Sequence, residues 1–337
     1  MILKQNISLL PYNTFGIDVK ADYLLEFFSV EDLQQSLASD IVNGKRILAV
    51  GCGSNLLFVS DFKGIILHSK INFITVVDQS DEFVFLEVGS GVVWDDFVQF
   101  CVDNNYYGAE NLSLIPGQTG AATVQNIGAY GVEIQSLVEM VKALEVVSGV
   151  PRCFTNSECR YDYRNSIFKN EAKDKFIITS TVFKLSKIEN YSLDYQQFKS
   201  EVEKRGTLSL QNVRNTIIEI RQQKLPDTTI LGNAGSFFKN PYCSRSQFEV
   251  LKRQYAKIPF YPVDNEFVKL PAAWLIEQSG CKGMILGNAQ VYDKQALVII
   301  NRGNAKGNEV VALAQFVQRA VFEKFAIRLE PEVNYIA

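Results

Sequence analysis

Ser236 is the side chain whose neighbours in the sequence best suit chemistry. It stands between Gly235 and two phenylalanines in the segment GNAGSFFKNP, residues 232–241. A hydroxyl in a turn of small residues, walled by aromatic rings, can be desolvated and aimed. An ordinary serine in a β-turn is the alternative, and these residues alone do not decide between the two.

Residues 115–131, IPGQTGAATVQNIGAYG, are a second candidate because they contain four glycines and few charges. So many small residues indicate that something flat or large packs against the backbone. The hydroxyl and amide groups between them suit a polar heterocycle that bears phosphates. A tightly packed segment rich in turns is the alternative.

Residues 50–56, VGCGSNL, follow a predicted strand, and their glycines would let backbone amides approach a phosphate. The segment is not a Rossmann fingerprint, because Leu56 stands where a third glycine is required and no helical pattern follows. Taken alone, a tight turn explains these residues better than a phosphate site.

The amino-acid composition limits the catalytic mechanisms that are possible. The chain has one histidine, His68, in the short apolar run 64–68, where we expect the end of a strand; Ser-His-Asp or Cys-His catalysis would have to use it. Proton chemistry must then use carboxylates, Lys, Tyr, Cys or an activated Ser. The six cysteines are scattered without a C-x-x-C pair, so we expect idle thiols and no metal site.

The distribution of charged and apolar residues indicates which kinds of binding partner to expect. A net charge of −3, with 34 basic and 37 acidic residues mixed along the chain, offers no basic stripe, so we expect no nucleic-acid partner. No run of residues approaches the length of a membrane span, and the first residues lack the plan of a signal peptide. We expect a cytoplasmic protein without a membrane partner.

Apolar periodicity predicts strands alternating with helices, typical of an α+β or α/β protein. The expected N-terminal elements are a strand over 22–28, a helix capped by residues 29–32, a strand over 46–50, a strand over 83–88, a helix with apolar positions Trp94, Phe97, Val98, Cys101 and Val102, and strands over 142–147 and 176–185.

A helical stretch around 210–220 ends before Pro226, and we place a domain boundary there. Beyond it we expect a helix that begins at Pro271 and closes at Gly280, a buried strand over 296–301, a helix over 308–324 and an extended, docked tail over 327–337. The length of 337 residues predicts two or three domains.

Taken in order, these segments resemble the UDP-N-acetylenolpyruvoylglucosamine reductase family. The resemblance extends from the segment NTFG, residues 13–16, to LEPEV, residues 329–333, and so covers nearly the whole chain. Its most specific motifs are residues 115–131, YDYRNSIFK at 161–169, residues 232–241 and LPAAWLIE at 270–277. The chain departs from the family at Cys52, Thr123 and Thr228; at the two threonines the family often has proline.

The resemblance implies an α+β protein with an FAD-binding fold of the vanillyl-alcohol-oxidase type in two subdomains, followed by a C-terminal α/β substrate domain. The implied division is residues 1–70 for the first FAD subdomain, on which the tail 325–337 docks, 71–222 for the second, and 223–324 for the substrate domain. FAD is the implied cofactor and NADPH the implied reductant. The implied FAD contacts are Gly51, Gly53, Ser54, Asn55, Pro116, Gly117, Gly120, Ala121, Ala122, Gln125, Asn126, Ile127, Gly128 and Tyr130.

The implied reaction reduces UDP-N-acetylglucosamine enolpyruvate to UDP-N-acetylmuramate, with Ser236 as proton donor and Arg164 and Glu332 as the polarising pair. An arginine fork matches a carboxylate, whereas a glutamate beside developing negative charge helps only if it is protonated or hydrogen-bonded. A serine hydroxyl is a poor acid by itself, so a cation such as Lys239 or a path of waters must assist it. The implied contacts to the UDP-sugar substrate are Tyr195, as a lid in the type I form of the family, Lys224, Asn240, Tyr261 and Gln295.

Two other functions remain open from the sequence. An oxidase or dehydrogenase of the same flavin fold would act on a small alcohol or sugar lactone and need no UDP site. A flavin- or nucleotide-binding module without turnover is the other, although the presence of Ser236, Arg164 and Glu332 argues against it. A monomer is the expected state.

Overall fold

The computed structural model describes residues 1–195 and 198–337, and its chain divides into two compact units. Unit 1 consists of Met1–Ile7, Ala21–Cys52 and Lys63–Arg221, and unit 2 of Ser8–Lys20, Gly53–Phe62 and Gln222–Ala337. Two N-terminal segments, expected in a subdomain of residues 1–70, therefore belong to the same unit as the C-terminal third of the chain. The chain passes from unit 1 to unit 2 for the last time between Arg221 and Gln222.

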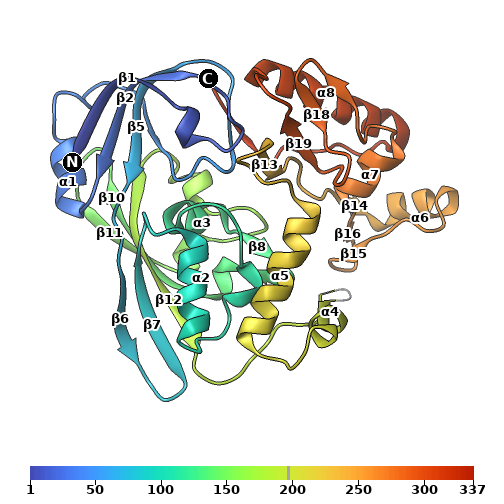
Figure 1. Ribbon diagram of the computed structural model, residues 1–337, viewed down its shortest axis with the longest axis horizontal. Helices are drawn as coiled ribbons and strands as arrows, with labels where there is room; N and C mark the ends of the chain where they lie inside the picture. Colours follow the sequence, from blue (N-terminus) through green and yellow to red (C-terminus); the bar gives the residue numbers. More distant parts are fainter. Residues whose placement is uncertain (196–197) are drawn as a thin grey trace. The chain divides into compact units, whose positions relative to one another are not determined.

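A four-stranded sheet built from the N-terminal residues has the order β1-β2-β5-β3, and its β3–β5 pair is parallel (Figure 1). Its strands are β1 (Ile2–Ser8), β2 (Lys20–Phe27), β3 (Ile47–Ala49) and β5 (Phe62–Ser69). The helix α1 (Val30–Leu37) begins where expected, because the Ser29 side chain accepts a hydrogen bond from the Asp32 N–H. His68 lies buried in β5, with Nδ1 3.0 Å from the Val50 carbonyl, a structural rather than catalytic setting.

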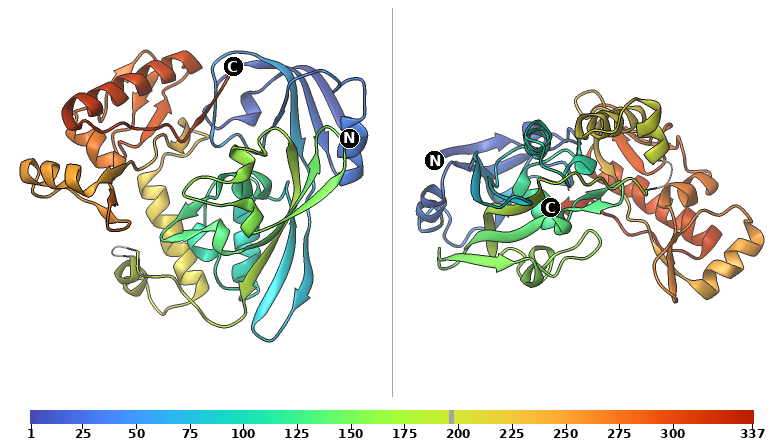
Figure 2. Two further views of the ribbon diagram at one scale, coloured as in Figure 1. Left: turned by 180° about the vertical axis from the view of Figure 1, so that it is seen from behind. Right: turned by 90° about the horizontal axis from the view of Figure 1, so that it is seen from below.

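The second sheet of unit 1 is antiparallel throughout, with the order β11-β10-β12-β7-β6 (Figures 1 and 2). Its strands are β6 (Ile74–Gln79), β7 (Phe83–Gly89), β10 (Val138–Glu145), β11 (Pro151–Thr155) and β12 (Phe176–Ser186). The central strand β12 is buried on both faces over residues 177–183.

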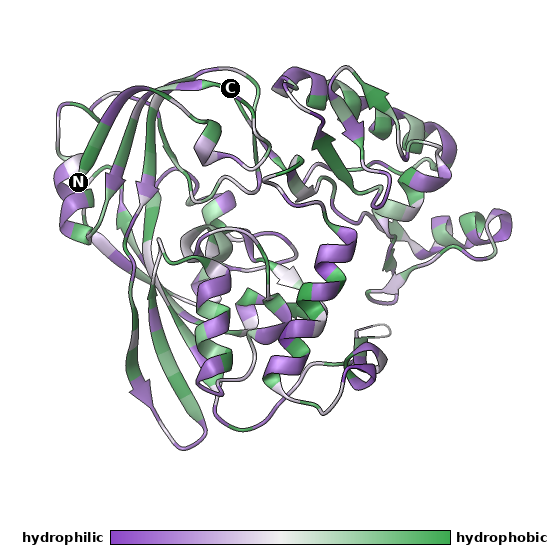
Figure 3. Ribbon diagram, in the orientation of Figure 1, coloured by the Kyte–Doolittle hydropathy of each residue, from purple (hydrophilic) through white to green (hydrophobic). Residues whose placement is uncertain are grey.

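The helix α2 (Trp94–Asp103) covers one face of this second sheet. Its buried side is the predicted stripe of five apolar residues, and the helix carries hydrophobic and hydrophilic stretches in turn (Figure 3). Trp94, which is 0% exposed, lies edge-on to Phe183 of β12 at 5.8 Å between ring centroids, and Phe97 stacks on the same ring at 4.9 Å. These aromatic contacts fix α2 on the sheet.

The remaining elements of unit 1 connect these layers. They are η2 (Glu110–Leu112), α3 (Thr119–Gln125), β8 (Gly128–Ala129), β9 (Val132–Glu133), η3 (Ile134–Ser136), η4 (Ser157–Cys159), η5 (Ile167–Lys169), α4 (Phe198–Lys204) and α5 (Leu210–Lys224), whose last residues pass into unit 2. The helix α3 was not predicted: it is short and built from glycine, alanine and β-branched threonine and valine, which together give little helical signal.

Unit 2 contains an antiparallel sheet of order β13-β19-β18-β17 with helices packed against it. Its elements are η1 (Leu10–Tyr12), β4 (Leu56–Phe58), β13 (Gly232–Ser236), β14 (Tyr242–Ser244), α6 (Arg245–Gln254), β15 (Tyr261–Pro262), β16 (Phe267–Lys269), α7 (Ala272–Gln278), β17 (Ile285–Leu286), β18 (Ala289–Val291), β19 (Val298–Asn301), α8 (Gly307–Phe325) and β20 (Asn334–Ile336). Phe15, Ile17 and Leu57, from the two N-terminal segments, share one buried cluster with α7, α8 and β19.

The tail is extended and docked as predicted, since β20 pairs in parallel with β4. Other expected bounds need adjustment by a few residues; the strand expected over 142–147 is β10 and runs over Val138–Glu145. The strand expected over 296–301 begins at Val298, and Pro271 is the N-cap of α7 rather than its first helical residue. No helix among the described residues combines the length and apolar character that crossing a membrane requires.

Asn13, the first residue of the NTFG segment in unit 2, makes a testable contribution to the fold. Its Nδ2 donates to the Leu9 and Ile17 carbonyls at 2.8 and 3.0 Å, and its Oδ1 accepts from the Ile17 N–H at 2.9 Å. Asn13→Ala leaves these buried backbone groups unpaired, so we expect a loss of about 2–4 kcal/mol in unfolding free energy, measured by urea denaturation. Asn43→Ala, at an exposed position, is the control and should change stability by less than about 0.5 kcal/mol.

Candidate functional site

Residues 115–131, called the cofactor loop below, are anchored to the end of β7 through α3. The Thr119 N–H donates to the Val92 carbonyl at 2.9 Å, and the Gly120 N–H donates to the Ser90 carbonyl at 3.0 Å. The Gln118 side chain donates to the Gly91 carbonyl at 2.9 Å. The first half of the loop is therefore held at defined positions before any ligand binds.

Two glycines of the cofactor loop are explained by the packing of the protein itself. A Cβ on Gly120 would lie 2.8 Å from the Ser90 Cβ, and one on Gly128 would lie 2.9 Å from the Glu133 Cγ. These two glycines are required by the protein's own packing, so they are weaker evidence for a ligand than their number suggested.

Gly51 is limited by the same kind of packing, because a Cβ there would lie 3.3 Å from the Ala121 Cβ and from the Gln118 Oε1. Ala121 itself is exposed. A glycine beside an exposed alanine leaves no large side chain at this point, which is compatible with the close approach of a flat ligand such as FAD.

The side-chain amide of Asn126 holds the second half of the loop. The backbone of Asn126 is left-handed, with φ of 48°. Its Nδ2 donates to the Glu133 carboxylate and to the Asp162 carbonyl, both at 2.8 Å, and its Oδ1 accepts from the Gln135 N–H at 3.1 Å. A single side chain therefore satisfies three groups and ties the loop to the segment 161–169.

Arg164 lies against this half of the loop. Its guanidinium donates to the Gly128 carbonyl at 2.7 Å and to the Asn126 carbonyl at 3.4 Å. Its backbone is also left-handed, with φ of 54°, and its carbonyl accepts from the Lys169 ammonium at 2.9 Å. Non-glycine residues in this conformation are uncommon and gather at functional sites. The structure thus brings a predicted catalytic residue to the predicted cofactor loop.

Tyr130 and Tyr195 also come together. Their rings meet edge to face with 6.0 Å between centroids, and a Cβ on Gly131 would lie 3.6 Å from the Tyr195 Cβ. Asn111, which is 0% exposed, joins the two segments, because its Nδ2 donates to the Tyr130 carbonyl at 2.9 Å and to the Ser192 carbonyl at 2.8 Å. Sequence analysis missed Asn111, since nothing in its spacing distinguishes it from an asparagine in a turn.

Arg221, near the end of α5, is a second cation at this loop. Burial lowers the pKa of its guanidinium, and the positive charge of Arg164 lowers that pKa further, while Tyr130 and Asp95 act in the opposite direction. Burial raises the pKa of the Tyr130 hydroxyl, so this phenol stays protonated at neutral pH. Two arginines therefore concentrate positive charge beside the cofactor loop, which favours an anionic ligand.

In unit 2, the turn that carries Ser236 is attached to the NTFG segment. The Thr14 hydroxyl donates to the Asn233 carbonyl at 2.6 Å, and the Asn233 N–H donates to the Thr14 carbonyl at 2.9 Å. A Cβ on Gly232 would lie 2.2 Å from the Phe15 carbonyl oxygen, so only glycine fits there. Two motifs more than 200 residues apart in sequence form one substructure.

Ser236 and Glu332 lie on adjacent backbones. Ser236 is exposed at the end of β13, and the Glu332 N–H donates to the carbonyl of the following residue, Phe237, at 2.8 Å. The Glu332 carbonyl in turn accepts from the Asn55 side chain at 3.2 Å. This part of unit 2 therefore joins the backbones of two predicted catalytic residues to Asn55, a predicted cofactor contact.

Lys239, expected as the cation that assists Ser236, also faces the tail. Its N–H donates to the Glu330 carbonyl at 2.9 Å, and its ammonium lies 3.8 Å from the Glu330 carboxylate. Its charge is therefore shared with a neighbouring carboxylate, which weakens the case for Lys239 as the activator of the serine.

The predicted substrate contacts other than Tyr195 lie in unit 2. Lys224 is exposed at the last residue of α5, and Tyr261 is half-buried in β15. The Asn240 Oδ1 accepts from the Ala272 N–H at 2.9 Å, at the start of α7, and the Gln295 Oε1 accepts from the Leu297 N–H at 3.4 Å. The two amides are thus oriented by the protein backbone.

The other predicted cofactor contacts divide between the units. Gly53 has a left-handed backbone, and a Cβ there would lie 2.0 Å from the Tyr12 carbonyl oxygen. Those of unit 1 not yet described are Pro116, which is exposed, Gly117, Ala122 and Ile127, which are buried, and Gln125, which accepts from the Lys169 ammonium at 2.8 Å. Ser54 is half-buried in unit 2. All six cysteines are free thiols.

Family comparisons agree with this arrangement. A family model described as "FAD binding domain" matches residues 21–151, which include the first part of unit 1 and most of the cofactor-loop contacts. A model described as "UDP-N-acetylenolpyruvoylglucosamine reductase, C-terminal domain" matches residues 225–336. The fold and the site thus define a flavin-dependent oxidoreductase that binds FAD.

Comparisons over the full length are more specific. A UDP-N-acetylenolpyruvoylglucosamine reductase of Bacteroides fragilis (strain YCH46) is 50% identical over 99% of this chain and 100% of its own length. One of Porphyromonas gingivalis (strain W83) is 46% identical over 100% of both chains. The chain belongs to the UDP-N-acetylenolpyruvoylglucosamine reductase family.

A solved structure also supports the fold. The reductase of that name from Thermus caldophilus matches with a TM-score of 0.69 at 21% identity, covering 100% of both chains. The family and the fold class predicted from the sequence are therefore confirmed.

Asn111 provides a test of the link between the cofactor loop and the tyrosine segment 191–195. Asn111→Ala removes the donor shared by the Tyr130 and Ser192 carbonyls, at a cost of about 1–3 kcal/mol in local opening. We expect chymotrypsin to cleave the 191–195 segment about 5- to 100-fold faster as a result. Asn104→Ala, on the surface of α2's C-terminus, should leave the cleavage rate unchanged; equal rates in the two variants would show that Asn111 does not hold the segment.

Proposed function

We propose that this chain reduces UDP-N-acetylglucosamine enolpyruvate to UDP-N-acetylmuramate, a step of peptidoglycan precursor synthesis, with FAD as cofactor and NADPH as reductant. The observation that carries the proposal is the hydrogen bond from the Glu332 N–H to the carbonyl of Phe237, the residue that follows Ser236, which brings the two backbones together in unit 2. The second half of such a reduction requires a proton donor and a polarising group within one site.

The reaction adds a hydride and a proton across the enolpyruvyl double bond. FAD would be held by the cofactor loop and would supply a carrier of hydride between NADPH and the terminal carbon of the enolpyruvyl group. Negative charge then develops on the adjacent carbon and its carboxylate. The protein has to stabilise that charge and provide the proton.

Arg164 is the residue that we assign to the carboxylate of the substrate. A guanidinium binds a carboxylate through paired N–H donors, and its charge opposes the charge that develops in the reaction. The bonds from Arg164 to the Gly128 and Asn126 carbonyls hold its fork in place before substrate arrives. A preorganised charge of this kind needs little rearrangement during the reaction.

Ser236 is the residue that we assign as proton donor to the adjacent carbon, and Glu332 is assigned to polarise the enolpyruvyl group. The bonds from Glu332 to Phe237 and from Asn55 to Glu332 fix the backbone at this point from two sides. A fixed backbone limits the motion of both side chains, which supports positioned proton transfer.

The nucleotide part of the substrate needs a cation and polar groups. We assign the exposed Lys224 to the diphosphate, and Asn240, Tyr261 and Gln295 to polar groups of the UDP-sugar. Tyr195 is assigned as the lid over the bound substrate. The division into three domains, a monomeric state and a cytoplasmic location complete the proposal.

Ser236→Ala tests the assignment of the proton donor. We expect reoxidation of the reduced flavin by the UDP-enolpyruvyl sugar to slow about 10²- to 10⁴-fold, because general acid catalysis is lost. Reduction of the flavin by NADPH should stay nearly unchanged. Anaerobic stopped-flow absorbance of the flavin measures both half-reactions separately.

Ser60→Ala is the matched control, since Ser60 is an exposed serine of the same unit whose hydroxyl bonds only a neighbouring carbonyl, that of Asp61. It should leave both half-reactions at wild-type rates. An equal loss in both half-reactions of Ser236→Ala would contradict the role as proton donor. Recovery of the flavin colour only with oxygen would contradict the reductase activity itself.

A further inference from the structure

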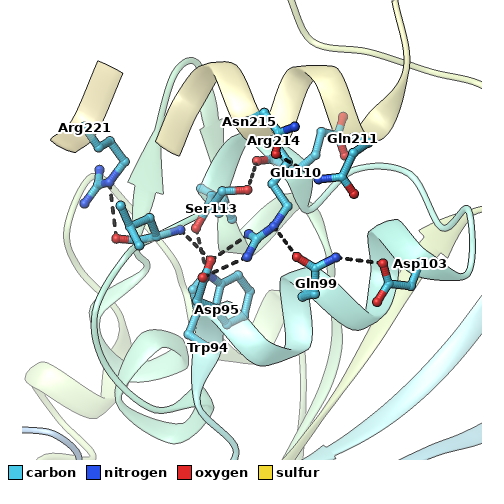
Figure 4. A network of polar contacts seen from close by, with 12 residues as sticks. Trp94, Asp95, Gln99, Asp103, Glu110, Ser113, Gln211, Arg214, Asn215 and Arg221 are labelled. Atoms are coloured by element: carbon cyan, nitrogen blue, oxygen red, sulfur yellow. Dashed lines mark hydrogen bonds and ion pairs between the residues drawn. The ribbon is translucent and has the colours of Figure 1, made fainter. Parts of the chain in front are cut away.

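An ion pair in unit 1, between the buried Arg214 and the half-buried Asp95, holds the residue that leads into the cofactor loop. The Arg214 guanidinium of α5 donates to both carboxylate oxygens of Asp95 of α2, at 2.7 and 2.8 Å (Figure 4). Arg214 is 5% exposed, and its Nε also donates to the Gln99 side chain at 2.8 Å. A bidentate pair with a buried guanidinium is geometrically specific, unlike a fully exposed ion pair.

The Asp95 carboxylate has a further partner, the Leu114 N–H, at 2.6 Å. Leu114 has φ of 57°, a left-handed conformation that costs a residue with a Cβ about 1–2 kcal/mol relative to glycine. Its carbonyl accepts from the Arg221 Nε at 3.3 Å (Figure 4). Both polar groups of this one residue are therefore held by charged side chains.

The geometry of α5 explains why two arginines act on one residue. Arg214 and Arg221 are seven positions apart, two helical turns, and so lie on the same face of α5. Arg214 acts on the Leu114 N–H through Asp95, whereas Arg221 acts on the Leu114 carbonyl directly. The left-handed turn at Leu114 sets the direction in which Ile115, Pro116 and Gly117 leave.

We infer that Asp95 and Arg214 are positioning residues that hold Leu114 in its left-handed conformation and thereby shape the cofactor loop for FAD. The inference rests on the assignment of FAD to this loop and adds residues that no motif of the family resemblance includes. Neither side chain needs to touch the cofactor, because both act through the Leu114 peptide.

The pair also predicts how stability depends on pH. Burial raises the pKa of the Asp95 carboxyl, but the bonds from Arg214 and from the Leu114 N–H, together with the charges of Arg214 and Arg221, outweigh it and lower the pKa below 3.8. A carboxyl whose pKa is lower in the folded state stabilises the fold above its unfolded value, and the stabilisation is lost as pH falls through the lowered value.

Asp95→Asn does not titrate, so it isolates this effect. The urea midpoint of the wild type should exceed that of Asp95→Asn by a constant amount above about pH 5, and the difference should shrink as pH falls below 3.8. A difference that stays constant between pH 6 and 3 would contradict the charged pair.

FAD release tests the inference directly. The holoprotein of Asp95→Ala/Arg214→Met lacks the acceptor for the Leu114 N–H without leaving an unpaired buried charge. We expect FAD to leave it about 5- to 30-fold faster than it leaves the wild type, the equivalent of about 1–2 kcal/mol. The increase in flavin fluorescence on release measures the rate.

Adding Leu114→Gly to this variant separates positioning from mere stability. Glycine adopts a left-handed φ without strain, so the triple variant should release FAD within about 3-fold of the wild-type rate. A pair that served only to join α2 and α5 would not be rescued by this change. Failure of the rescue, or an unchanged release rate in the folded double variant, overturns the inference.

The matched control breaks another ion pair of α5 that does not reach the loop. Arg205→Met/Glu219→Ala removes the 2.7 Å bond between Arg205 and Glu219 and should leave FAD release unchanged.

Arg214→Lys is the variant to use if the double variant does not fold. Lysine keeps the positive charge but loses the paired N–H donors of the guanidinium, so FAD release should rise by a smaller factor. Adding Leu114→Gly should again remove this increase. Purified wild-type protein that carries no FAD and binds none when FAD is added would contradict the cofactor assignment instead.

Discussion

The cofactor loop depends on one physical constraint, the need to pair the buried polar groups of an irregular backbone. The one helix within it, α3, has seven residues, so ladder hydrogen bonds satisfy only part of the loop. Unpaired buried N–H and C=O groups are costly, and side chains must therefore take their place. Asn111 and Arg164 do so for the loop carbonyls of Tyr130, Asn126 and Gly128. Asp95 does so for the Leu114 N–H just before the loop, and the loop's own Gln118 and Asn126 bond backbone carbonyls of neighbouring segments.

The same constraint fixes the surroundings of Arg164, the residue proposed to stabilise negative charge in the reaction. The carbonyls that receive bonds from Arg164 belong to Asn126 and Gly128, and Asn126 is itself fixed by its contacts to Glu133 and Asp162. A charge that is to stabilise a developing anion gains most from an environment that does not have to reorganise. The left-handed residues of the loop store strain that these contacts hold in place.

Unit 2 applies the same principle with different residues. Asn13, Asn233 and Asn301 are buried amides that bond backbone groups of Ile17 just after the NTFG segment, of Gly235 in the serine turn and of Gly303 just after β19. They keep Ser236 at the end of β13, where the tail brings Glu332 alongside it. Small side chains with two kinds of polar atom suit this task, because one amide can both donate and accept.

The sequence by itself determined the features that arise from local pattern. The apolar stripe of α2, the cap at Ser29, the end of the central helix before Pro226 and the ordered glycine motifs all follow from the types and spacing of neighbouring residues, and they were sufficient to predict the α+β fold and the family. The same motifs pointed to Ser236, Arg164 and Glu332, but through resemblance rather than through chemistry visible in the chain.

Tertiary structure alone decided which distant residues meet. Nothing between Asp95 and Arg214, 119 positions apart, indicates that they bond, and nothing near Leu114 indicates that it would need them. The helix α3 escaped prediction because its residues favour helix only weakly and packing against β7 and β12 stabilises it. Phe15 and Leu57 belong to the core of unit 2 because two N-terminal segments return to the C-terminal part of the chain, and the spacing of apolar residues does not reveal that return. Local pattern reports the preferences of neighbouring residues, whereas the partners that satisfy a buried polar group are chosen by the fold as a whole.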